Sequence, residues 1–558
     1  MKSFGRYLAA AAIAVAICFS ADGRGSVVVG RITDSYTGRG IAGVPVTDGY
    51  TFVKTNASGR YRIKPDQRAA RIYYSTPAEY EVALDGRTHR PAFYSAEDIR
   101  TKGRQRIDFS LTPLPDGPEK DFTLLMVGDP QCGNRAEAAR YRNETMPDIM
   151  ATAEACQGNV YAFTLGDVTY DSADMWEEMA GTMSNISTSR GYLPFFQCMG
   201  NHDHNSLAED TDDDADDDRR AHGLFVSTFG PSDYSFDRGD AHIVVMDDII
   251  VKAHKASTRS NKLTWTYSGG FTDEQIEWLR QDFACVDKPE EKVLIFCVHI
   301  PFRGSAARNE NHFGDVLKMM TAFKECHIMS GHTHTQYNFI HKGAVAAGGS
   351  TVYEHVHGTA CGGWWVNNTN LGGSPCAYNV YSVSGANVSS WRFKGVGHDA
   401  DYQLRVYDGS QTYTGDRGVE YRWYDLKTKD AAGTVSDGFE EAKGALVAEV
   451  FDDDYFNWKV EMWIDGVKAG DFIHKNKNIS NIALAAFFHN VQGRQGKNWR
   501  GNNTPHYWYF PLPEGITAED LESGRHSWEV RAVFTVPTNK ANVLTYSCQH
   551  ITRDYSQF

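Results

Sequence analysis

The chain has 558 residues, of which 41% are hydrophobic and 23% charged, and its formal net charge is −15. This length exceeds what one compact core normally holds, so several domains are expected. The acidic balance and the lack of any Lys/Arg-rich run in the sequence argue against a surface that binds a nucleic-acid duplex.

Residues 1–20 have the pattern of a secretory signal peptide. Lys2 and Arg6 form a basic start, and the apolar stretch that follows is too short to cross a membrane comfortably. Small residues permit cleavage before Ala21, and a lipoprotein signal ending at Cys18 is the alternative that the sequence leaves open. No other stretch of the sequence is apolar enough to form a transmembrane segment. We therefore predict an exported protein.

Residues 26–113 have the pattern of a small β-sandwich. Short β-branched runs alternate with Thr-Gly, Asp-Gly and Ser-Gly turn signals. The stretch resembles the carboxypeptidase-regulatory-like, transthyretin-type modules at the front of exported bacterial enzymes. It contains no cluster of catalytic residue types, so a spacer or packing role is expected.

Residues 121–398 alternate strand and helix signals, which favours a layered α/β core with buried strands. The segments 122–129 and 160–167 are apolar runs of strand length, and 135–156 between them is typical of a helix. A second helix is predicted after Thr272, which with Gln275 forms a capping box.

Residues 400–558 are all-β in pattern and rich in Trp, Tyr and Gly, which predicts a second β-sandwich. Its aromatic residues could bind glycan, but aromatic stripes in sandwiches more often form the core. Between the two regions, Cys361 and Cys376 flank a Gly-rich loop and are the best disulfide candidates.

Polar side chains follow five apolar strands of the α/β region at the points where the strands end. Because strand ends converge at one edge of such a sheet, these side chains are expected to meet. Mixed carboxylate, amide and imidazole ligands suit Mn, Fe or Zn, and there are too many for one ion. Phosphoryl-transfer hydrolases use two metals about 3.5–4 Å apart. The residues concerned are Asp129, Asp167, Asn201, His202, His299, His332 and His334.

The order of these motifs resembles a known family. "GDPQ", "GDVTYD", "GNHD", "VH" and "GHTH" resemble the five-block signature of the calcineurin-like metallophosphoesterases over residues 121–345. The resemblance implies a two-sheet β-sandwich flanked by helices, here placed between N- and C-terminal all-β domains. It implies a phosphoric ester hydrolase with two divalent metal ions, in which a hydroxide between the metals attacks phosphorus. Flanking domains of this kind resemble those of exported bacterial proteins, periplasmic or on the cell surface.

The resemblance also assigns roles to residues. The metal ligands that it implies are Asp129 and His334 for the first metal, Asn201, His299 and His332 for the second, and Asp167 as the bridge between them. His202 would stabilise developing charge or protonate the leaving oxygen, with Asp203 orienting its ring.

One position departs from the family pattern. Gln131 stands where the family usually has a histidine, and an amide oxygen ligates metal more weakly than imidazole. Tyr170 in "GDVTYD" is the alternative ligand, because that block also resembles the purple acid phosphatases. We favour Gln131 as a ligand or a neighbouring group, with Tyr170 packing near the site.

Other polar residues are weighed by their sequence context. His355 and His357 in "EHVHG" follow no comparable apolar strand, so a loop is expected there. The acidic run 209–218 lacks the Gly and the distal Glu of a calcium loop, which favours a solvated loop. The candidate substrate-binding residues are Arg303, His204, Tyr170 and Trp364.

The sequence thus predicts an exported metal-dependent phosphoesterase. Aromatic and Gly-rich loops after "GHTH" favour a substrate with a sugar or a base beside the phosphate, either a small phosphate ester or a phosphorylated glycan, and a diester over a monoester. The alternative is an inactive glycan- or surface-binding module in which Gln131 marks lost catalysis. A metal-dependent hydrolase of another bond is the second alternative.

Overall fold

The computed structural model of the chain places most of the sequence. The predicted signal peptide and the first half of the acidic run lie outside the described residues. The structure describes residues 26–100, 103–204, 214–255, 263–414, 420–424, 428–429, 435–436, 438–475, 479, 481–482, 484, 487, 504 and 506–554.

The N-terminal domain is a small β-sandwich, as predicted. One sheet has the order β4-β1-β6, with β7 also paired to β1, and the other has the order β3-β2-β5. Tyr73 fixes this domain to the core, because its hydroxyl donates to the Asp233 carbonyl at 2.9 Å and accepts from Trp278 Nε1 at 3.1 Å. The strands are β1 (Val27–Asp34), β2 (Pro45–Thr47), β3 (Phe52–Lys54), β4 (Arg60–Ile63), β5 (Tyr73–Tyr74), β6 (Arg104–Arg106) and β7 (Phe109–Leu111).

The central core is a sandwich of a five-stranded and a six-stranded sheet. Phe163, Phe196 and Phe236 stack between the sheets, with ring centres 5.0 and 4.4 Å apart in successive pairs. The first sheet runs β12 (Phe195–Cys198), β9 (Asn159–Leu165), β8 (Asp121–Val127), β21 (Ala377–Ser384) and β22 (Asn387–Gly395). The second runs β13 (Tyr234–Arg238), β14 (Ala241–Val245), β17 (Val293–Cys297), β18 (Glu325–Ser330), β20 (Thr351–Val356) and β19 (Tyr337–Val345).

The strands that precede the polar motifs run parallel within each sheet. β8, β9 and β12 are parallel neighbours in the first sheet, and β14, β17, β18 and β20 are parallel neighbours in the second. Parallel strands buried on both faces read as continuous apolar runs, which is why the sequence revealed them. Within each sheet, the carboxyl ends of these strands therefore lie at the same edge.

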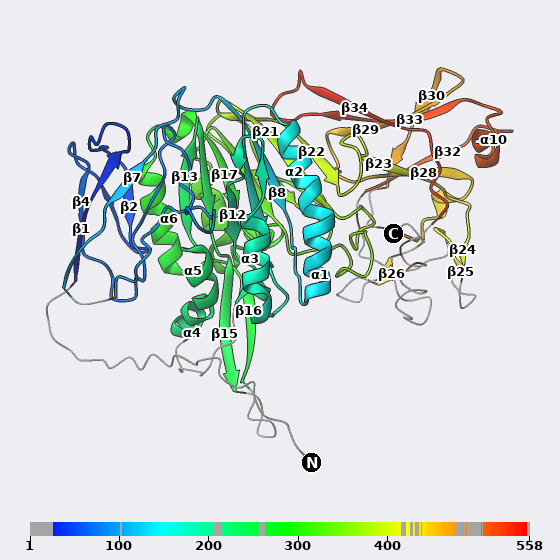
Figure 1. Cartoon of the computed structure of the whole chain (residues 1–558). Helices are drawn as coiled ribbons and strands as arrows, with labels where there is room; N and C mark the ends of the chain where they lie inside the picture. The colour runs from blue at the N-terminus through cyan, green and yellow to red at the C-terminus, as the bar shows by residue number, and fades with distance from the viewer. Residues whose placement is uncertain are drawn as a thin grey trace, which may run out of the picture.

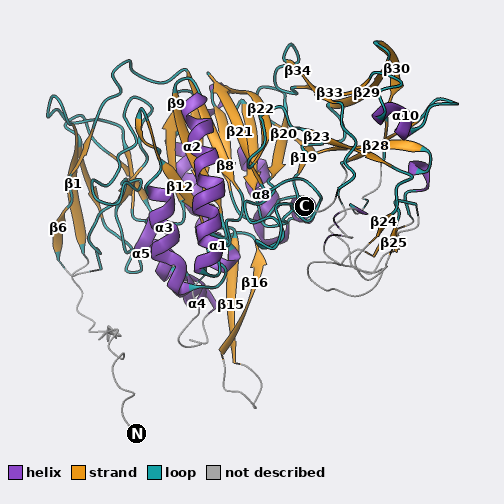
Figure 2. Ribbon diagram, turned by 45° about the vertical axis from the view of Figure 1, so that its right-hand side comes forward, coloured by secondary structure: helices purple, strands orange, loops and turns teal. Residues whose placement is uncertain are grey.

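Helices cover the outer faces of the sandwich, and Figure 2 shows α1, α2 and α3 in front of β8, β9 and β12. The helix predicted over 135–156 is interrupted by a π-helical turn, Tyr141–Thr145. α6 begins after the predicted capping box of Thr272 and Gln275. The α-helices of the core are α1 (Arg135–Arg140), α2 (Met146–Ala155), α3 (Trp176–Ser184), α4 (Asp214–Ala221), α5 (Gly223–Phe229), α6 (Asp273–Cys285), α7 (Ser305–Arg308) and α8 (Phe313–Met320). The 3₁₀ turns are η2 (Ala173–Met175), η3 (Asn201–Asp203), η4 (Pro289–Glu291), η5 (Glu310–His312) and η6 (Glu440–Ala442).

The C-terminal domain is a second β-sandwich, which lies across the core from the N-terminal domain (Figure 1). Its Trp423, Trp458 and Trp508 are buried, so the aromatic residues form a core. The sheets are β23 (Leu404–Asp408), β28 (Ala445–Val450), β32 (Tyr507–Pro511) and β31 (Ile473–His474), and β30 (Val467–Asp471), β29 (Trp458–Ile464), β33 (Trp528–Thr535) and β34 (Val543–Cys548). The predicted fold class, a layered core between two all-β domains, is confirmed.

Short elements complete the chain. The hairpin of β15 (Ile249–Lys255) and β16 (Leu263–Gly269) projects from the core in Figure 1. The remaining elements are β10 (Ser187–Thr188), β11 (Gly191–Tyr192), β24 (Tyr413–Thr414), β25 (Glu420–Tyr421), β26 (Thr428–Lys429), β27 (Val435–Ser436) and α10 (Ala518–Glu522). Among the residues that the structure describes, no helix has the length and apolar character needed to cross a membrane.

Three sequence predictions are wrong. Cys361 and Cys376 are free thiols, because Cys361 turns its sulfur toward Thr359 and the strand ends. His355 lies on the buried strand β20 and not in a loop, since its Nε2 contacts His327 Nδ1 at 3.0 Å. The end of the acidic run is helix α4 and not a solvated loop, and its Asp218 is buried.

Candidate metal centre

The carboxyl ends of five strands bring the predicted ligands together. Two motif glycines permit the close approach: a Cβ on Gly200 would lie 2.4 Å from Asp167 Oδ1, and one on Gly331 would lie 2.6 Å from Asp129 Oδ2. Several candidate ligands also have positive φ angles, a strained conformation that costs about 1–3 kcal/mol each and collects at functional sites. These are Asp129 (φ 40°), Gln131 (44°), Asp167 (52°), His332 (70°) and His334 (53°).

The best-defined group of donor atoms surrounds Asp167. His299 Nδ1 donates to the Leu165 carbonyl at 2.7 Å, so the neutral ring carries a lone pair on Nε2. That Nε2 lies 3.4 Å from Asp167 Oδ2, 3.0 Å from Asn201 Oδ1 and 3.1 Å from His332 Nδ1. Four atoms that can each offer a lone pair therefore face one another at a buried point. A divalent cation is the group that such a set fits.

A second group of donor atoms surrounds Asp129. Its carboxylate accepts from the backbone N–H of His332 at 3.0 and 3.2 Å and lies 3.8 Å from His334 Nε2. His334 Nδ1 donates to the Gly362 carbonyl at 3.3 Å, which leaves Nε2 without a proton in the neutral ring. The structure thus places Asp129 and His334 together, as the sequence predicted.

The electrostatics of these groups favour cation binding. Burial raises the pKa of Asp129 to about 8, and the nearby carboxylate of Asp167 adds to this rise. Burial lowers the pKa of His332 to about 3 and that of His334 to about 4, so both rings are neutral and ready to ligate. Burial also lowers the pKa of His299, but the Asp167 charge outweighs it and raises that pKa to about 10. A cation would take the place of this proton.

Family comparisons agree with this geometry. The model described as "Calcineurin-like phosphoesterase" matches residues 122–336, which include all of the candidate ligands. The models described as its N terminal and its C terminal match residues 26–114 and 354–536. The chain belongs to the calcineurin-like phosphoesterase family. As a member of this family, the chain is a metal-dependent phosphoesterase. It also has the N-terminal and C-terminal domains that the family models describe.

Comparisons with individual proteins add little. The crystal structure of a 5'-nucleotidase precursor from Thermus thermophilus shares 10% identity with this chain, covers 76% of it and 89% of its own chain, and has a TM-score of 0.27. A likeness at this level carries no argument about substrate. No curated protein matches the chain at a significant level.

Gln131, the departure from the family pattern, is buried inside the centre. Its Nε2 donates to Asp167 Oδ2 at 3.1 Å, and Cys361 Sγ lies 3.7 Å from its Oε1. Rotation of the amide by half a turn would present Oε1 to a cation bound at Asp167. Tyr170 is 47% exposed, and its ring stacks on that of His202 with centres 4.5 Å apart. These positions agree with Gln131 in the ligand set and with Tyr170 packed beside it.

We predict that Gln131 controls the affinity of the first metal. Gln131→His should lower the metal concentration that gives half-maximal activity, because imidazole binds more strongly than an amide oxygen, and Gln131→Ala should raise it. We expect about 10–100-fold, the range typical for groups that support a metal site. Metal titrations of activity in both variants measure this. Equal half-maximal concentrations in the wild type, Gln131→His and Gln131→Ala would remove Gln131 from the ligand set.

The predicted proton donor, His202, lies at the edge of the centre. The prediction that Asp203 orients its ring is wrong. Asp203 does not orient the His202 ring, because its oxygens accept from the backbone N–H groups of Thr169 at 3.2 Å and Gly200 at 3.0 Å. Asp171 takes that place, with its Oδ1 3.0 Å from His202 Nδ1. Asp203 thus stabilises the turn, and Asp171 accepts the ring's Nδ1 proton, so that Nε2 is the nitrogen free to transfer a proton.

We predict that Asp171 sets the alkaline limit of activity. Burial lowers the pKa of His202, but the hydrogen bond with Asp171 and the Asp167 charge outweigh it and raise that pKa above its ordinary value. A protonated donor is lost as pH rises through this pKa. Asp171→Asn keeps an acceptor for Nδ1 but removes the charge, so the alkaline limb of the kcat–pH profile should move to lower pH. Asp174→Asn, an exposed neighbour, is the matched control. An unmoved alkaline limb with a lower plateau would show that Asp171 acts on structure alone.

Three exposed aromatic side chains stand beside the histidines of the centre. Trp364 is 40% exposed, and its ring centre lies 4.9 Å from that of His334. Tyr267, from the projecting hairpin, is 41% exposed and meets His332 edge-on at 6.2 Å. Together with Tyr170 they form what we call the aromatic rim. The structure thus agrees with the placement predicted for Tyr170 and Trp364.

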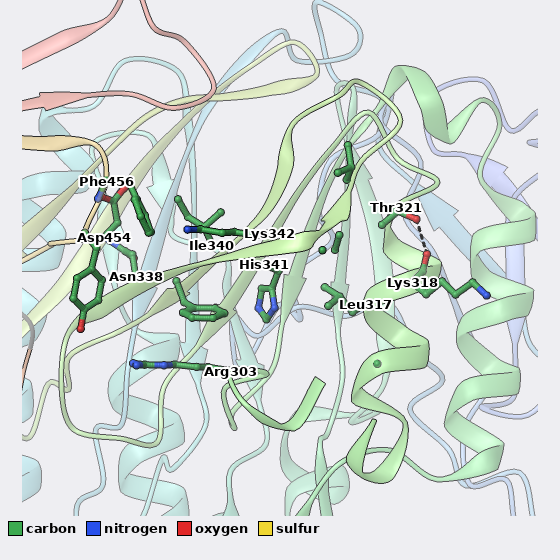
Figure 3. A pocket seen from close by; sticks show the side chains of 16 residues that line it. Arg303, Leu317, Lys318, Thr321, Asn338, Ile340, His341, Lys342, Asp454 and Phe456 are labelled. Atoms are coloured by element: carbon green, nitrogen blue, oxygen red, sulfur yellow. Dashed lines mark hydrogen bonds between the residues drawn. The ribbon is translucent and has the colours of Figure 1, made fainter. Parts of the chain in front are cut away.

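The other two candidate substrate-binding residues lie elsewhere. His204 is buried, so its prediction as a substrate contact is wrong. The Arg303 guanidinium lies over the rings of Tyr337 and Phe339, 5.1 and 5.3 Å from their centres, and faces a pocket of about 910 Å³ between β19, α8 and residues 454–456 (Figure 3). None of the candidate metal ligands lines this pocket. We place the active centre at the strand ends, where the ligand chemistry is, and the Arg303 role stays a prediction.

Sequence reasoning missed three residues of the site. Asp248 accepts from the backbone N–H groups of His299 at 3.1 Å and Ile300 at 3.0 Å and so fixes the histidine's turn. It follows the end of the apolar strand β14 by three residues, a signal similar to the one that indicated the metal ligands. Asp171 ends the "GDVTYD" block, so its signal was also present. Tyr267 had no signal, because only the fold brings its hairpin to the centre.

Proposed function

We propose that this chain is an exported phosphoesterase with two divalent metal ions that hydrolyses phosphate diesters in preference to monoesters. The observation that supports it best is the pairing of two donor groups, around Asp167 and around Asp129, with a proton donor at their edge. The two ions, as Mn, Fe or Zn, would supply Lewis acidity and lower the pKa of a water molecule. Asp129, Gln131 and His334 would hold the first ion, Asn201, His299 and His332 the second, and Asp167 both.

The residues of the chain would handle the leaving group. His202 Nδ1 donates to Asp171, so the second proton of the imidazolium is on Nε2. As a water oxygen bonds to phosphorus and its proton passes to solvent, the ester P–O bond would break and the leaving oxygen would take the Nε2 proton, which His202 regains from solvent. Asp171 stabilises the imidazolium before the transfer and keeps the ring oriented. This is general acid catalysis with a positioned imidazole.

The aromatic rim supports a substrate that carries a ring beside the phosphate. The apolar faces of exposed Trp and Tyr rings can stack on sugars and bases, and here three such rings gather beside one centre. A diester has a group on each side of phosphorus, so one can leave near His202 while the other rests on Trp364 or Tyr267. The substrate class is then a small phosphodiester or a phosphorylated glycan.

The proposal is tested on the chain from Ala21 onward, reconstituted separately with Mn²⁺, Fe²⁺ and Zn²⁺. We expect hydrolysis of bis(p-nitrophenyl) phosphate with a higher kcat/KM than that of p-nitrophenyl phosphate. Higher kcat/KM for the monoester would contradict the diester preference. Bound metal with no hydrolysis of either phosphate ester would favour the binding module. Hydrolysis of carboxylic esters alone would favour a metal-dependent hydrolase of another bond. Sequencing the N-terminus of protein from the cell envelope tests export, and a lipidated Cys18 would replace cleavage before Ala21.

A further inference from the structure

A second cluster of metal-ligating side chains lies outside the candidate metal centre. His204 directly follows η3, Asp218 lies on α4, His222 joins α4 to α5, and Asp247 follows β14. The cluster shares no residue with the centre. All four side chains are nearly enclosed, with exposed fractions of 1% for His204 and Asp247, 11% for Asp218 and 15% for His222. We call these four residues the His₂Asp₂ cluster.

Three distances between donor atoms of the His₂Asp₂ cluster are close to those of a tetrahedral metal site. Asp247 Oδ2 lies 3.4 Å from His204 Nε2 and 3.0 Å from His222 Nε2, and Asp218 Oδ2 lies 3.8 Å from His222 Nε2. One ligand atom each from His204, Asp218 and His222 lie within 4.8 Å of one another. With zinc–ligand bonds of about 2.0–2.2 Å, the ligand atoms of a tetrahedral site are about 3.3 Å apart. The measured distances lie on both sides of that value.

The donor atoms lie at ion-pair distance from one another but are not aligned as hydrogen bonds. Within the described part of the chain, His204 Nε2, His222 Nε2 and Asp247 Oδ2 are buried and have no hydrogen-bond partner. His204 Nδ1 donates to the Gly200 carbonyl at 2.9 Å, so Nε2 of the neutral ring carries a lone pair and faces the Asp247 carboxylate. The two imidazole rings are 77° apart and 5.2 Å between centres. Buried polar atoms left in this way are costly, and a cation at their common point would satisfy all of them.

We propose that His204, Asp218, His222 and Asp247 bind a zinc ion with a structural role, separate from the dinuclear centre. Two imidazoles and two carboxylates suit zinc, whereas calcium and magnesium take oxygen ligands. Four protein ligands leave no open position, which is the arrangement of structural zinc sites and not of catalytic ones.

The zinc would join segments that carry the active centre. His204 lies two residues after His202, and Asp247 precedes Asp248, which holds the backbone of His299. Asp218 also accepts from the backbone N–H of Val251 at 2.6 Å, which attaches the first strand of the projecting hairpin. One ion thus fixes the turn of the proton donor, the support of a metal-ligating histidine and the base of the hairpin that bears Tyr267. It also accounts for the burial of Asp218 at the end of an acidic run.

The competing explanation is a proton on His222, paired with the two carboxylates. Burial lowers the pKa of His222, but Asp247 and Asp218 outweigh it and raise that pKa to about 9. Such a proton would pair His222 with Asp247 but would leave the His204 Nε2 lone pair directed at the same carboxylate. A metal ion satisfies both rings, so the two explanations differ in whether the cluster holds an ion.

The decisive measurement is a crystal structure of the zinc-saturated wild-type protein with anomalous data collected on both sides of the zinc edge. We expect a zinc peak among His204 Nε2, His222 Nε2, Asp218 and Asp247, in addition to peaks at the strand ends. Peaks at the strand ends alone would overturn the proposal and leave the dinuclear centre intact. A peak in the cluster alone would support it and contradict the dinuclear centre.

Variants give a second, independent readout in solution. In the Asp167→Asn background, which weakens the dinuclear centre, zinc should still raise the Tm, because an ion that binds only the folded state stabilises it. Adding His222→Ala should abolish this Tm shift and remove one zinc equivalent by elemental analysis. His526→Ala, which replaces a histidine paired with Asp465 in the C-terminal domain, is the matched control and should keep both. An unchanged zinc-dependent Tm shift in folded His222→Ala protein would overturn the proposal. If that variant does not fold, His204→Cys, which retains a zinc ligand, should keep the shift, and its loss in folded His204→Cys protein would also overturn it.

Discussion

Asp167→Asn is expected to lower turnover by about 10³-fold or more and to weaken binding of both catalytic metals. The scale follows from the loss of a group that stabilises charge in a water-excluded site. Asp167 Oδ2 lies next to Gln131 Nε2 and His299 Nε2, whereas Oδ1 accepts from the backbone N–H of His202 at 2.9 Å. It therefore stands between the two donor groups. Asparagine has the same shape but offers one neutral oxygen where the carboxylate offers two charged ones.

The measurement is kcat at saturating metal together with metal retention during dialysis against a chelator. Asp174→Asn, which changes an exposed aspartate nearby to the same residue, controls for the loss of one surface charge. Unchanged circular dichroism would show that the Asp167→Asn chain folds. Two tightly bound metals with near-normal turnover in that chain would contradict the bridging role.

Much of the centre could be predicted because the carboxyl ends of parallel strands lie together at one edge of a sheet. Asp129, Asp167 and His299 each follow a parallel strand that is buried over all or nearly all of its length, and such strands are visible as continuous apolar runs. The structure adds a reason for the glycine of the "GNHD" block, since no side chain fits where Gly200 meets Asp167. These signals are local, so one sequence was enough to find them.

Side-chain direction could not be predicted. Asp203 is next to His202 in sequence, but the 3₁₀ turn η3 points its carboxylate back at the Gly200 N–H. Asp171, 31 residues earlier, reaches the His202 ring instead. The direction of a side chain on such a turn depends on the turn's backbone, which the fold determines.

The sequence analysis also failed to predict a buried strand that carries polar residues. β20 carries Glu354 and His355 on a strand that is buried between its neighbours, so it lacks the apolar run of a core strand. Long-range partners satisfy these groups: His341 Nε2 lies 2.9 Å from Glu354 Oε2, and His327 contacts His355. Only the tertiary structure shows that such partners exist, and the same holds for Asp218 on α4.

The effect of His202→Ala on esters with different leaving groups is the sharpest test of whether the chain is an enzyme or a binding module. Because His202 is not among the proposed metal ligands, His202→Ala should keep both catalytic metals. Its removal should lower turnover by about 10²–10⁴-fold, the contribution typical of a general acid. This loss should apply to esters of poor leaving groups, such as alkyl and sugar alcohols, which cannot depart without a proton.

The loss should be much smaller for p-nitrophenyl esters, because nitrophenolate is stable without a proton. Turnover of a methyl and a p-nitrophenyl ester of the same phosphate, compared within the same His202→Ala preparation, isolates the proton transfer from any change in folding or metal content. An equal loss for both esters would mean that His202 stabilises charge at phosphorus and does not protonate the leaving oxygen. No loss for either would leave His202 without a chemical role and would favour the binding module. A loss confined to the methyl ester is expected, since the Asp171–His202 pair holds a proton at Nε2 for a leaving oxygen that needs one.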